Sequence, residues 1–179
     1  MKNQQKLSKF LALILRHNPG KINLKLDAHG WADVAELIEK TNQHRKLSIS
    51  MADLEQVVAN NSKQRYRFND DKTRIRANQG HSIDIDLGLE PTIPPAVLYH
   101  GTASRFVDSI MEKGLVSGRR QHVHLSLDIE TATTVGKRHG KPVILTVDTA
   151  QMSADGFLFY LSHNNVWLTK HVPVKYLSS

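Results

Sequence analysis

The pattern of apolar residues changes once along the chain, on the two sides of residues 83–95. That segment contains three prolines and has no helical periodicity, which is typical of a linker. Before it, apolar residues recur at the spacing of amphipathic helices, whereas short runs of β-branched and aromatic residues follow it. A chain of 179 residues is long enough for two small domains. The sequence therefore predicts an α+β protein with one lobe at residues 1–82, a linker at 83–95 and a second lobe at 96–179.

The first lobe is predicted to contain three helices. Apolar residues share one helical face over residues 7–15, and this helix ends before Pro19, because the residue preceding a proline avoids the α conformation. A short strand is expected at residues 22–26, where apolar residues alternate, and a second helix is expected around residues 34–38. A third helix follows Ser50, which starts a capping-box pattern.

A basic β-hairpin is predicted after the third helix. Residues 65–68 and 73–76 alternate around a polar turn, which is a hairpin pattern. Between Lys63 and Arg76 six residues are basic and two are acidic, whereas the rest of residues 1–90 is balanced. Three helices followed by a basic hairpin indicate a winged-helix lobe with a basic wing. A hairpin with a merely solvated charged face is the alternative.

The second lobe is predicted to be dominated by antiparallel strands. Two helical stretches, near residues 106–113 and 129–139, lie between strand-like runs, a pattern typical of an α+β domain. The strand-like runs are residues 97–100, 123–126, 143–147, 157–160 and 166–168.

Composition excludes some functions and favours an anionic partner. The formal charge is +7 and the isoelectric point is about 9.7. The chain has no cysteine, so thiol chemistry and disulfides are excluded. We expect no membrane association, because no apolar run approaches the roughly 20 residues that span a bilayer. The N-terminal residues lack the apolar core of a signal peptide. We therefore expect a cytoplasmic protein, and a monomer.

The sequence gives little support for a metal site, for paired catalytic carboxylates or for a glycine-rich nucleotide loop. His122 and His124 fall on one face of a predicted strand and would suit zinc, but no third ligand is evident, so no metal is expected. The last 89 residues contain only two glutamates, Glu112 and Glu130, which leaves little for paired-carboxylate hydrolysis. No glycine-rich nucleotide loop of the Walker or dinucleotide type is present.

Arginine and histidine concentrate in two places that suit phosphate. Arg16 and His17 stand at the C-terminal end of the first helix, and Arg120 precedes the run His122-Val123-His124. Arginine offers a fixed fork of donors to phosphate oxygens, and histidine can donate a hydrogen bond or move a proton near neutral pH. A cation at a helix C-terminus is also favoured by the helix dipole alone, which is the competing explanation for Arg16.

Five motifs occur in a fixed order along the chain. They are Leu15-Arg16-His17-Asn18-Pro19, Ile75-Arg76-Ala77-Asn78-Gln79-Gly80-His81-Ser82, Leu98-Tyr99-His100-Gly101-Thr102, His122-Val123-His124-Leu125-Ser126 and Val166-Trp167-Leu168-Thr169. With these motifs the chain resembles the RNA 2′-phosphotransferases, the tRNA-splicing phosphotransferases whose bacterial members are called KptA, and the resemblance covers essentially its whole length.

The resemblance implies a fold and a reaction. It implies a winged-helix RNA lobe followed by a lobe of the ADP-ribosyltransferase type that binds NAD. It also implies NAD-dependent removal of an internal RNA 2′-phosphate in two steps. The 2′-phosphate attacks the nicotinamide ribose and expels nicotinamide, and a neighbouring ribose hydroxyl then attacks phosphorus. The products are 2′-hydroxyl RNA and ADP-ribose 1″,2″-cyclic phosphate, and NAD is consumed as a co-substrate.

The resemblance also implies the residues of the site. Two of the catalytic arginines have a neighbouring alternative. Arg119 could take the place of Arg120, and Arg67 is a weaker alternative to Arg65. Arg120 is preferred because the family pattern has one residue between the arginine and His-Val-His. The implied catalytic residues are Arg16, His17, Arg65 and Arg120, and the implied NAD-binding residues are His100, Gly101, Thr102, His124, Ser126 and Val166.

The residue at position 166 agrees with this chemistry. Many ADP-ribosyltransferases use a glutamate where Val166 stands, to activate a neutral acceptor. A 2′-phosphate is already an anion, so a glutamate there would repel it, whereas arginines would neutralise the charge that develops at phosphorus.

Two alternative functions remain. A winged-helix regulator is disfavoured because the third helix has no arginine or lysine, and a nucleic-acid ADP-ribosyltransferase would stop after the first step.

Overall fold

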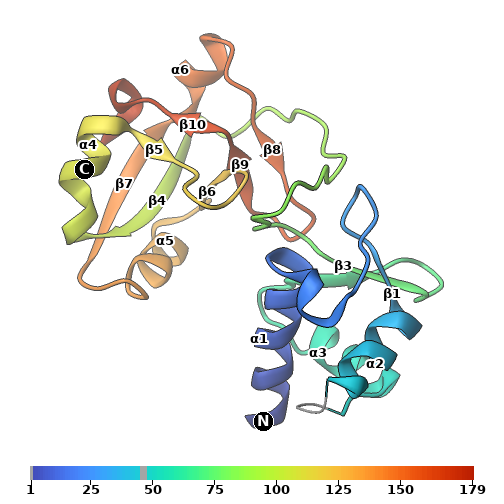
Figure 1. Cartoon of the computed structure of the whole chain (residues 1–179). Coiled ribbons are helices and arrows are strands. Elements are labelled where there is room, and N and C mark those ends of the chain that lie inside the picture. The colour runs from blue at the N-terminus through green and yellow to red at the C-terminus, as the bar shows by residue number, and fades with distance from the viewer. Residues whose placement is uncertain (1, 45–47) are drawn as a thin grey trace. The chain divides into compact units, whose positions relative to one another are not determined.

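The chain folds into two compact units, residues 1–88 and 89–179. The computed structural model describes residues 2–44 and 48–179 (Figure 1). The division between the units falls inside the proline-containing segment at residues 83–95. Each unit combines helices with small antiparallel sheets around its own hydrophobic core, so the protein is α+β.

The first unit contains the three predicted helices and the predicted hairpin. Ser50 caps the third helix through a complete capping box with Asp53, as its sequence pattern predicts. The elements are α1 (Lys2–Arg16), the 3₁₀ turn η1 (Pro19–Ile22), β1 (Ala32–Asp33), α2 (Val34–Gln43), α3 (Met51–Ala59), β2 (Tyr66–Phe68) and β3 (Arg74–Ala77).

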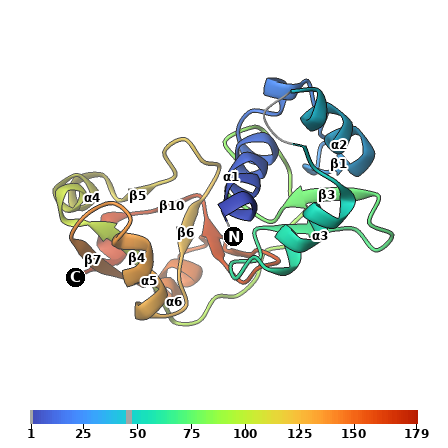
Figure 2. The same ribbon diagram turned by 90° about the horizontal axis from the view of Figure 1, so that it is seen from below.

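The core of the first unit lies between its helices and a three-stranded antiparallel sheet of order β1-β3-β2. Helix α1 buries Leu7, Leu11, Ile14 and Leu15, because these residues share one face of the helix. Figure 2 shows the three helices gathered around β3. Consequently, α1 ends next to the sheet, and the segment that follows β3 is positioned by both.

The strand predicted at residues 22–26 is wrong. Pro19 instead begins the turn η1, and Asn23 ends it in the left-handed conformation with φ of 53°. The apolar residues Ile22 and Leu24 are buried all the same, although this segment pairs with no strand among the described residues. The alternating apolar residues at 22–26 therefore reflect the burial of this segment, although the segment is not a paired strand.

The second unit is built from short strands and short helices. Its central strands β4 and β7 pair antiparallel over seven residues, from Val97↔Asp148 to Ala103↔Pro142. The elements are β4 (Val97–Ala103), the 3₁₀ turn η2 (Ser104–Phe106), α4 (Val107–Lys113), β5 (Leu115–Val116), β6 (Val123–Leu125), α5 (Ile129–Gly136), β7 (Pro142–Asp148), α6 (Thr149–Ala154), β8 (Tyr160–Leu161), β9 (Trp167–Thr169), β10 (His171–Val172), the 3₁₀ turn η3 (Val174–Tyr176) and β11 (Leu177–Ser178).

Three small antiparallel sheets organise the second unit, in the orders β11-β7-β4, β6-β9-β8 and β10-β5. Strands β4 and β6 are joined by an isolated bridge between Tyr99 and Ser126, with N···O distances of 2.9 and 2.7 Å. Gly101 on β4 lies against α5, where an added Cβ would overlap the carbonyl oxygen of Ala132. Glycine at position 101 therefore allows α5 to approach the strand.

Two details of the second unit differ from the sequence-based prediction. The strand predicted at residues 157–160 is confined to Tyr160–Leu161, because the unpredicted helix α6 ends just before it. Gly156, with φ of 89°, and a hydrogen bond from the Phe157 amide to the Met152 carbonyl terminate α6. The helical stretch at residues 129–139 is an α-helix only as far as Gly136.

Candidate functional site

The end of helix α1 gives Arg16 and His17 different surroundings. Arg16 is the last residue of α1 and is buried, with 7% of its surface exposed, whereas His17 is exposed. The amides of His17 and Asn18 both donate to the Leu13 carbonyl, at 3.1 and 2.8 Å. These bonds close the helix before Pro19. The Arg16 guanidinium lies over the ring of Tyr66, with 5.9 Å between Cζ and the ring centroid.

The segment that follows β3 links the three predicted residues of the first unit. The Ser82 amide donates to the Arg16 carbonyl at 2.9 Å, and the Ser82 hydroxyl lies 2.9 Å from Nδ1 of His17. The Asn78 amide donates to the Arg65 carbonyl at 2.8 Å. Residues 78–82 therefore bring Arg16, His17 and Arg65 together. Asn78 and Ser82 are not among the site residues predicted from the sequence, although both belong to the motif that ends in Gly-His-Ser.

Gly80 occupies the middle of this segment and faces Arg16. Its φ of 87° is one that residues with a side chain rarely adopt. A Cβ at this position would lie 3.5 Å from Nη1 of Arg16. The position beside the guanidinium could hold a Cβ in ordinary contact, so it is the positive φ that favours glycine here.

His81 is a buried histidine at the centre of this cationic region. Only 1% of its surface is exposed, and neither ring nitrogen has a hydrogen-bond partner within residues 2–44 and 48–179. Burial, followed by the charges of Arg16, Arg76 and His17, lowers the pKa of His81 from 6.5 to about 4. The imidazole is therefore neutral at physiological pH. His81 therefore adds no further positive charge next to Arg16 and Arg76.

Arg65 lies beside a polar groove between α1 and α3. The half-buried guanidinium donates from Nη1 to Oδ1 of Asn61 at 3.4 Å. The other candidate, Arg67, stacks instead on the ring of Trp31 at 5.2 Å. Of the two arginines, Arg65 is the one whose carbonyl accepts the hydrogen bond from the Asn78 amide. The groove has a volume of about 330 Å³ and is lined by Gln4, Gln5, Ser8, Val57, Asn60, Asn61, Ser62 and Arg65.

In the second unit, His100 is held by its neighbouring strand. Its Nδ1 lies 3.0 Å from the carbonyl oxygen of His124. A carbonyl only accepts hydrogen bonds, so Nδ1 carries the proton and Nε2 of the neutral ring is an acceptor. Burial lowers the pKa of His100, and the bond to the carbonyl opposes this effect. His100 is thus suited to accept a hydrogen bond from a hydroxyl group.

The other residues predicted to bind a cofactor lie on the same strands or next to them. Gly101 and Thr102 follow His100 on β4 and are buried, and Ser126 is paired with Tyr99 of that strand. Val166 precedes β9, and its amide donates to Oγ of Ser162 at 3.0 Å. His124 on β6 faces Leu168 of β9 in the strand register. The predicted set therefore spans β4, β6 and the start of β9.

Arg119 and Arg120 lie in the loop between β5 and β6, and both are exposed. The Arg120 amide donates to the Ser117 carbonyl at 3.1 Å, which forms a turn ahead of His122. The His122 ring contacts Tyr160 edge-on, with centroids 5.9 Å apart. The two arginines have similar surroundings, so the preference for Arg120 remains a prediction from spacing.

The described residues contain neither a cluster of metal ligands nor a helix that could span a membrane. Among residues 2–44 and 48–179, no group of three or more histidine, cysteine, aspartate or glutamate side chains is placed to hold a metal ion. Within the same residues, every helix is too short or too polar to cross a membrane.

Comparisons with known proteins place the chain beside one family. The sequence profile described as RNA 2′-phosphotransferase, Tpt1 / KptA family, matches residues 2–171. A probable RNA 2′-phosphotransferase of Flavobacterium johnsoniae is 57% identical over 172 residues, which cover 96% of this chain and 93% of that protein. A protein of the same description from Fusobacterium nucleatum is 53% identical over 178 residues, 99% of each chain. One from Hahella chejuensis is 54% identical over 171 residues, 96% of this chain and 91% of that protein.

The buried, neutral state of His81 predicts a loss of stability in acid. In the unfolded chain the imidazole takes up a proton below its ordinary pKa of 6.5, whereas in the folded chain it does so only near pH 4. Unfolding is therefore favoured as the pH falls from about 6.5 to 4, by up to about 3 kcal/mol at this residue. We expect His81→Gln to lose about that much less stability than the wild type between pH 7 and pH 4, as measured by urea denaturation. Equal losses in the two proteins would contradict the assignment of a buried, neutral imidazole.

Proposed function

The chain belongs to the RNA 2′-phosphotransferase family of Tpt1 and KptA, and from this premise we propose that it transfers an internal 2′-phosphate from RNA to NAD. The 2′-phosphate attacks the nicotinamide ribose as nicotinamide leaves, and the adjacent ribose hydroxyl then attacks phosphorus and displaces the RNA 2′-oxygen. The products are 2′-hydroxyl RNA, nicotinamide and ADP-ribose 1″,2″-cyclic phosphate. In this proposal the first unit is a winged-helix RNA lobe, and the second is an NAD lobe of the ADP-ribosyltransferase type.

One observation carries the proposal for the first unit. Residues 78–82 hold Arg16, His17 and Arg65 through three contacts of 2.8 to 2.9 Å. Two arginines and a histidine gathered in this way suit a dianionic phosphate, because guanidinium groups bind its oxygens through charge-assisted hydrogen bonds. The order α1, β1, α2, α3, β2, β3 and the antiparallel sheet support a winged helix.

In the proposed mechanism three arginines neutralise charge and one histidine moves a proton. Arg16, Arg65 and Arg120 stabilise the negative charge on the 2′-phosphate and at phosphorus in the second step. His17 is exposed and is held by Ser82, so it can donate to a phosphate oxygen or deliver a proton to the departing 2′-oxygen. The proton of the attacking ribose hydroxyl ends on that 2′-oxygen, so the second step balances without a metal ion.

The second unit fits NAD through the chemistry of its donors and acceptors. NAD supplies the ribose carbon from which nicotinamide departs. His100, with Nε2 as an acceptor, suits a ribose hydroxyl, and its tautomer is fixed by the His124 carbonyl. Val166 contributes no carboxylate, which suits an acceptor that already carries negative charge. Gly101, Thr102, His124 and Ser126 complete the proposed NAD site.

The direct test is incubation with a short RNA that bears an internal 2′-phosphate, with and without NAD. We expect loss of the phosphate only with NAD, and no requirement for added metal. Mass analysis of the products separates this reaction from one that stops at the first step, because the latter leaves ADP-ribose attached to the RNA. Full activity without NAD, or abolition by a chelator with recovery on adding metal, would contradict the proposal.

The adjacent arginines of the second unit provide a matched pair of variants. We expect Arg120→Ala to slow the reaction by roughly 10²–10³-fold, because it removes a charge-assisted contact that strengthens in the transition state. Arg119→Ala is the control, since it removes the same charge from the neighbouring exposed position. Single-turnover rates of the two variants give the comparison. Equal losses, or a larger loss for Arg119→Ala, would show that the assignment is out of register.

A further inference from the structure

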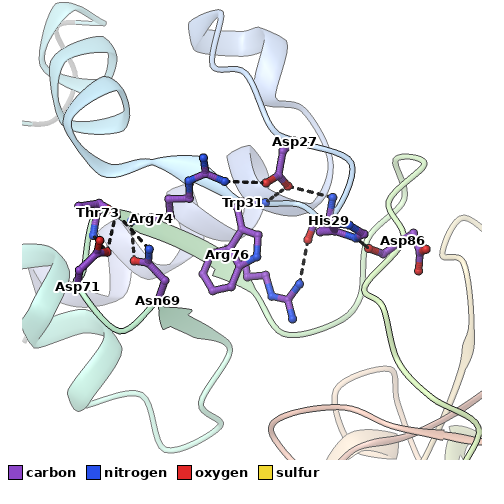
Figure 3. A network of polar contacts seen from close by, with 9 residues as sticks. All are labelled: Asp27, His29, Trp31, Asn69, Asp71, Thr73, Arg74, Arg76 and Asp86. Atoms are coloured by element: carbon purple, nitrogen blue, oxygen red, sulfur yellow. Dashed lines mark hydrogen bonds and ion pairs between the residues drawn. The ribbon is translucent and has the colours of Figure 1, made fainter.

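Two arginines and a tryptophan form a second cationic cluster in the first unit. Figure 3 shows two of its members, Trp31 and Arg76. Arg67 on β2 and Arg76 on β3 are direct cross-strand partners. Both guanidinium groups lie over the ring of Trp31, with Cζ 5.2 and 4.6 Å from its centroid. Like charges directly opposite each other destabilise a strand pair. This cluster of Trp31, Arg67 and Arg76, called the Trp31 cluster below, therefore keeps positive charge together at a cost in stability.

Arg76 bears most of that cost. Only 7% of its surface is exposed, and burial together with the charge of Arg67 lowers its pKa to about 10. Nη1 donates to the His29 carbonyl at 3.1 Å, but the buried Nε has no hydrogen-bond partner within the described residues. Buried guanidinium groups are ordinarily paired. The incomplete pairing of Arg76 indicates a site for an anion.

The carboxylate whose charge acts on Arg76, Asp27, is engaged elsewhere. Asp27 accepts from the amides of His29 and Trp31, each at 2.9 Å, and forms an ion pair with Arg74 at 3.1 Å (Figure 3). Arg76 itself forms no ion pair with any carboxylate of residues 2–44 and 48–179. Asp27 therefore holds the loop that carries Trp31 and is ion-paired with Arg74 instead of Arg76, although its charge partly opposes the lowering of the Arg76 pKa.

The Trp31 cluster lies close to the residues proposed to bind the 2′-phosphate. Arg16 and Arg76 both act on the buried ring of His81, since the charge of each lowers its pKa. His81 and Arg16 are joined in turn by residues 80–82, since the Ser82 amide donates to the Arg16 carbonyl and a Cβ added at Gly80 would lie 3.5 Å from Nη1 of Arg16. The cationic region therefore extends from Arg16, which is proposed to bind the 2′-phosphate, to the Trp31 cluster, for which no ligand has yet been proposed.

We propose that Arg76, supported by Arg67 and Trp31, binds the 3′-phosphodiester of the nucleotide that carries the 2′-phosphate. This inference rests on the proposed function. An internal 2′-phosphate has a second phosphate on the adjacent oxygen of the same ribose, so two anions must be accommodated one ribose apart. A terminal 2′-phosphate next to a free 3′-hydroxyl lacks the second anion. Arg76 is accordingly a specificity-determining residue for internal positions.

The test compares two RNA oligonucleotides of the same sequence. One carries the 2′-phosphate at an internal nucleotide, and the other ends in a 2′-phosphate with a free 3′-hydroxyl. The ratio of kcat/KM for the internal and the terminal substrate is measured for the wild type, Arg76→Met and Arg76→Lys. We expect Arg76→Met to lower this ratio by about 10- to 100-fold, the effect of losing a hydrogen-bonded charge pair. We expect Arg76→Lys to lower it less, because the charge is kept and the fork is lost.

Lys72→Met is the control, since Lys72 is an exposed cation of the same hairpin and its ion pair is with Glu55, away from the Trp31 cluster. It should keep the wild-type ratio. A merely structural role for Arg76 would lower both activities together and leave the ratio unchanged, which would overturn the inference. If thermal unfolding shows that Arg76→Met is not folded, Arg76→Lys carries the same comparison, and an unchanged ratio there overturns it equally. A wild type that acts on neither substrate with NAD would instead contradict the proposed function.

Discussion

The burial of the Arg16 guanidinium at the end of α1 is the constraint on which the first unit depends. Removing a charge from water is costly, so its surroundings must repay that cost. The C-terminal end of the helix favours a cation, the Tyr66 ring lies beneath it, and the chain at Gly80 passes beside it. Tyr66 is fixed in turn by its hydroxyl, which donates to the Ser8 carbonyl on α1 at 2.5 Å. A helix end, a hairpin and a loop are therefore fitted to one another around a positive charge.

The same constraint explains why residues 78–82 contain so many special positions. Asn78 and Ser82 bond to backbone carbonyls of the flanking elements, Gly80 has a positive φ, and His81 is buried in its neutral form. Each of these features keeps positive groups close to one another without adding a carboxylate. In the second unit a single backbone contact has a similar role, because the His124 carbonyl fixes the tautomer of His100. Both units thus fix donors and acceptors through backbone contacts between elements distant in sequence.

Local sequence patterns predict the elements of this protein better than they predict its site. The helices and the hairpin follow from periodicity and from the cap at Ser50, which are local properties. The same patterns wrongly predict a strand at residues 22–26, because Pro19 and Asn23 set the backbone there while burial sets the pattern. The motifs place Arg16 and Arg65 in a site, but the burial of Arg16, His81 and Arg76 depends on contacts between separate elements. Only the spacing to His122-Val123-His124 favours Arg120 over Arg119, because the two residues are adjacent and both exposed.

The central claim is that the cationic residues gathered by residues 78–82 bind a 2′-phosphate. The most direct measurement is calorimetric titration of the protein with an RNA dinucleotide that carries the 2′-phosphate, and with the same dinucleotide without it, both in the absence of NAD. Two or more charge-assisted contacts predict that the phosphorylated ligand binds at least about 100-fold more tightly. They also predict that this advantage shrinks as salt is raised, because the contacts replace bound counterions. Equal affinity for the two dinucleotides would contradict the account.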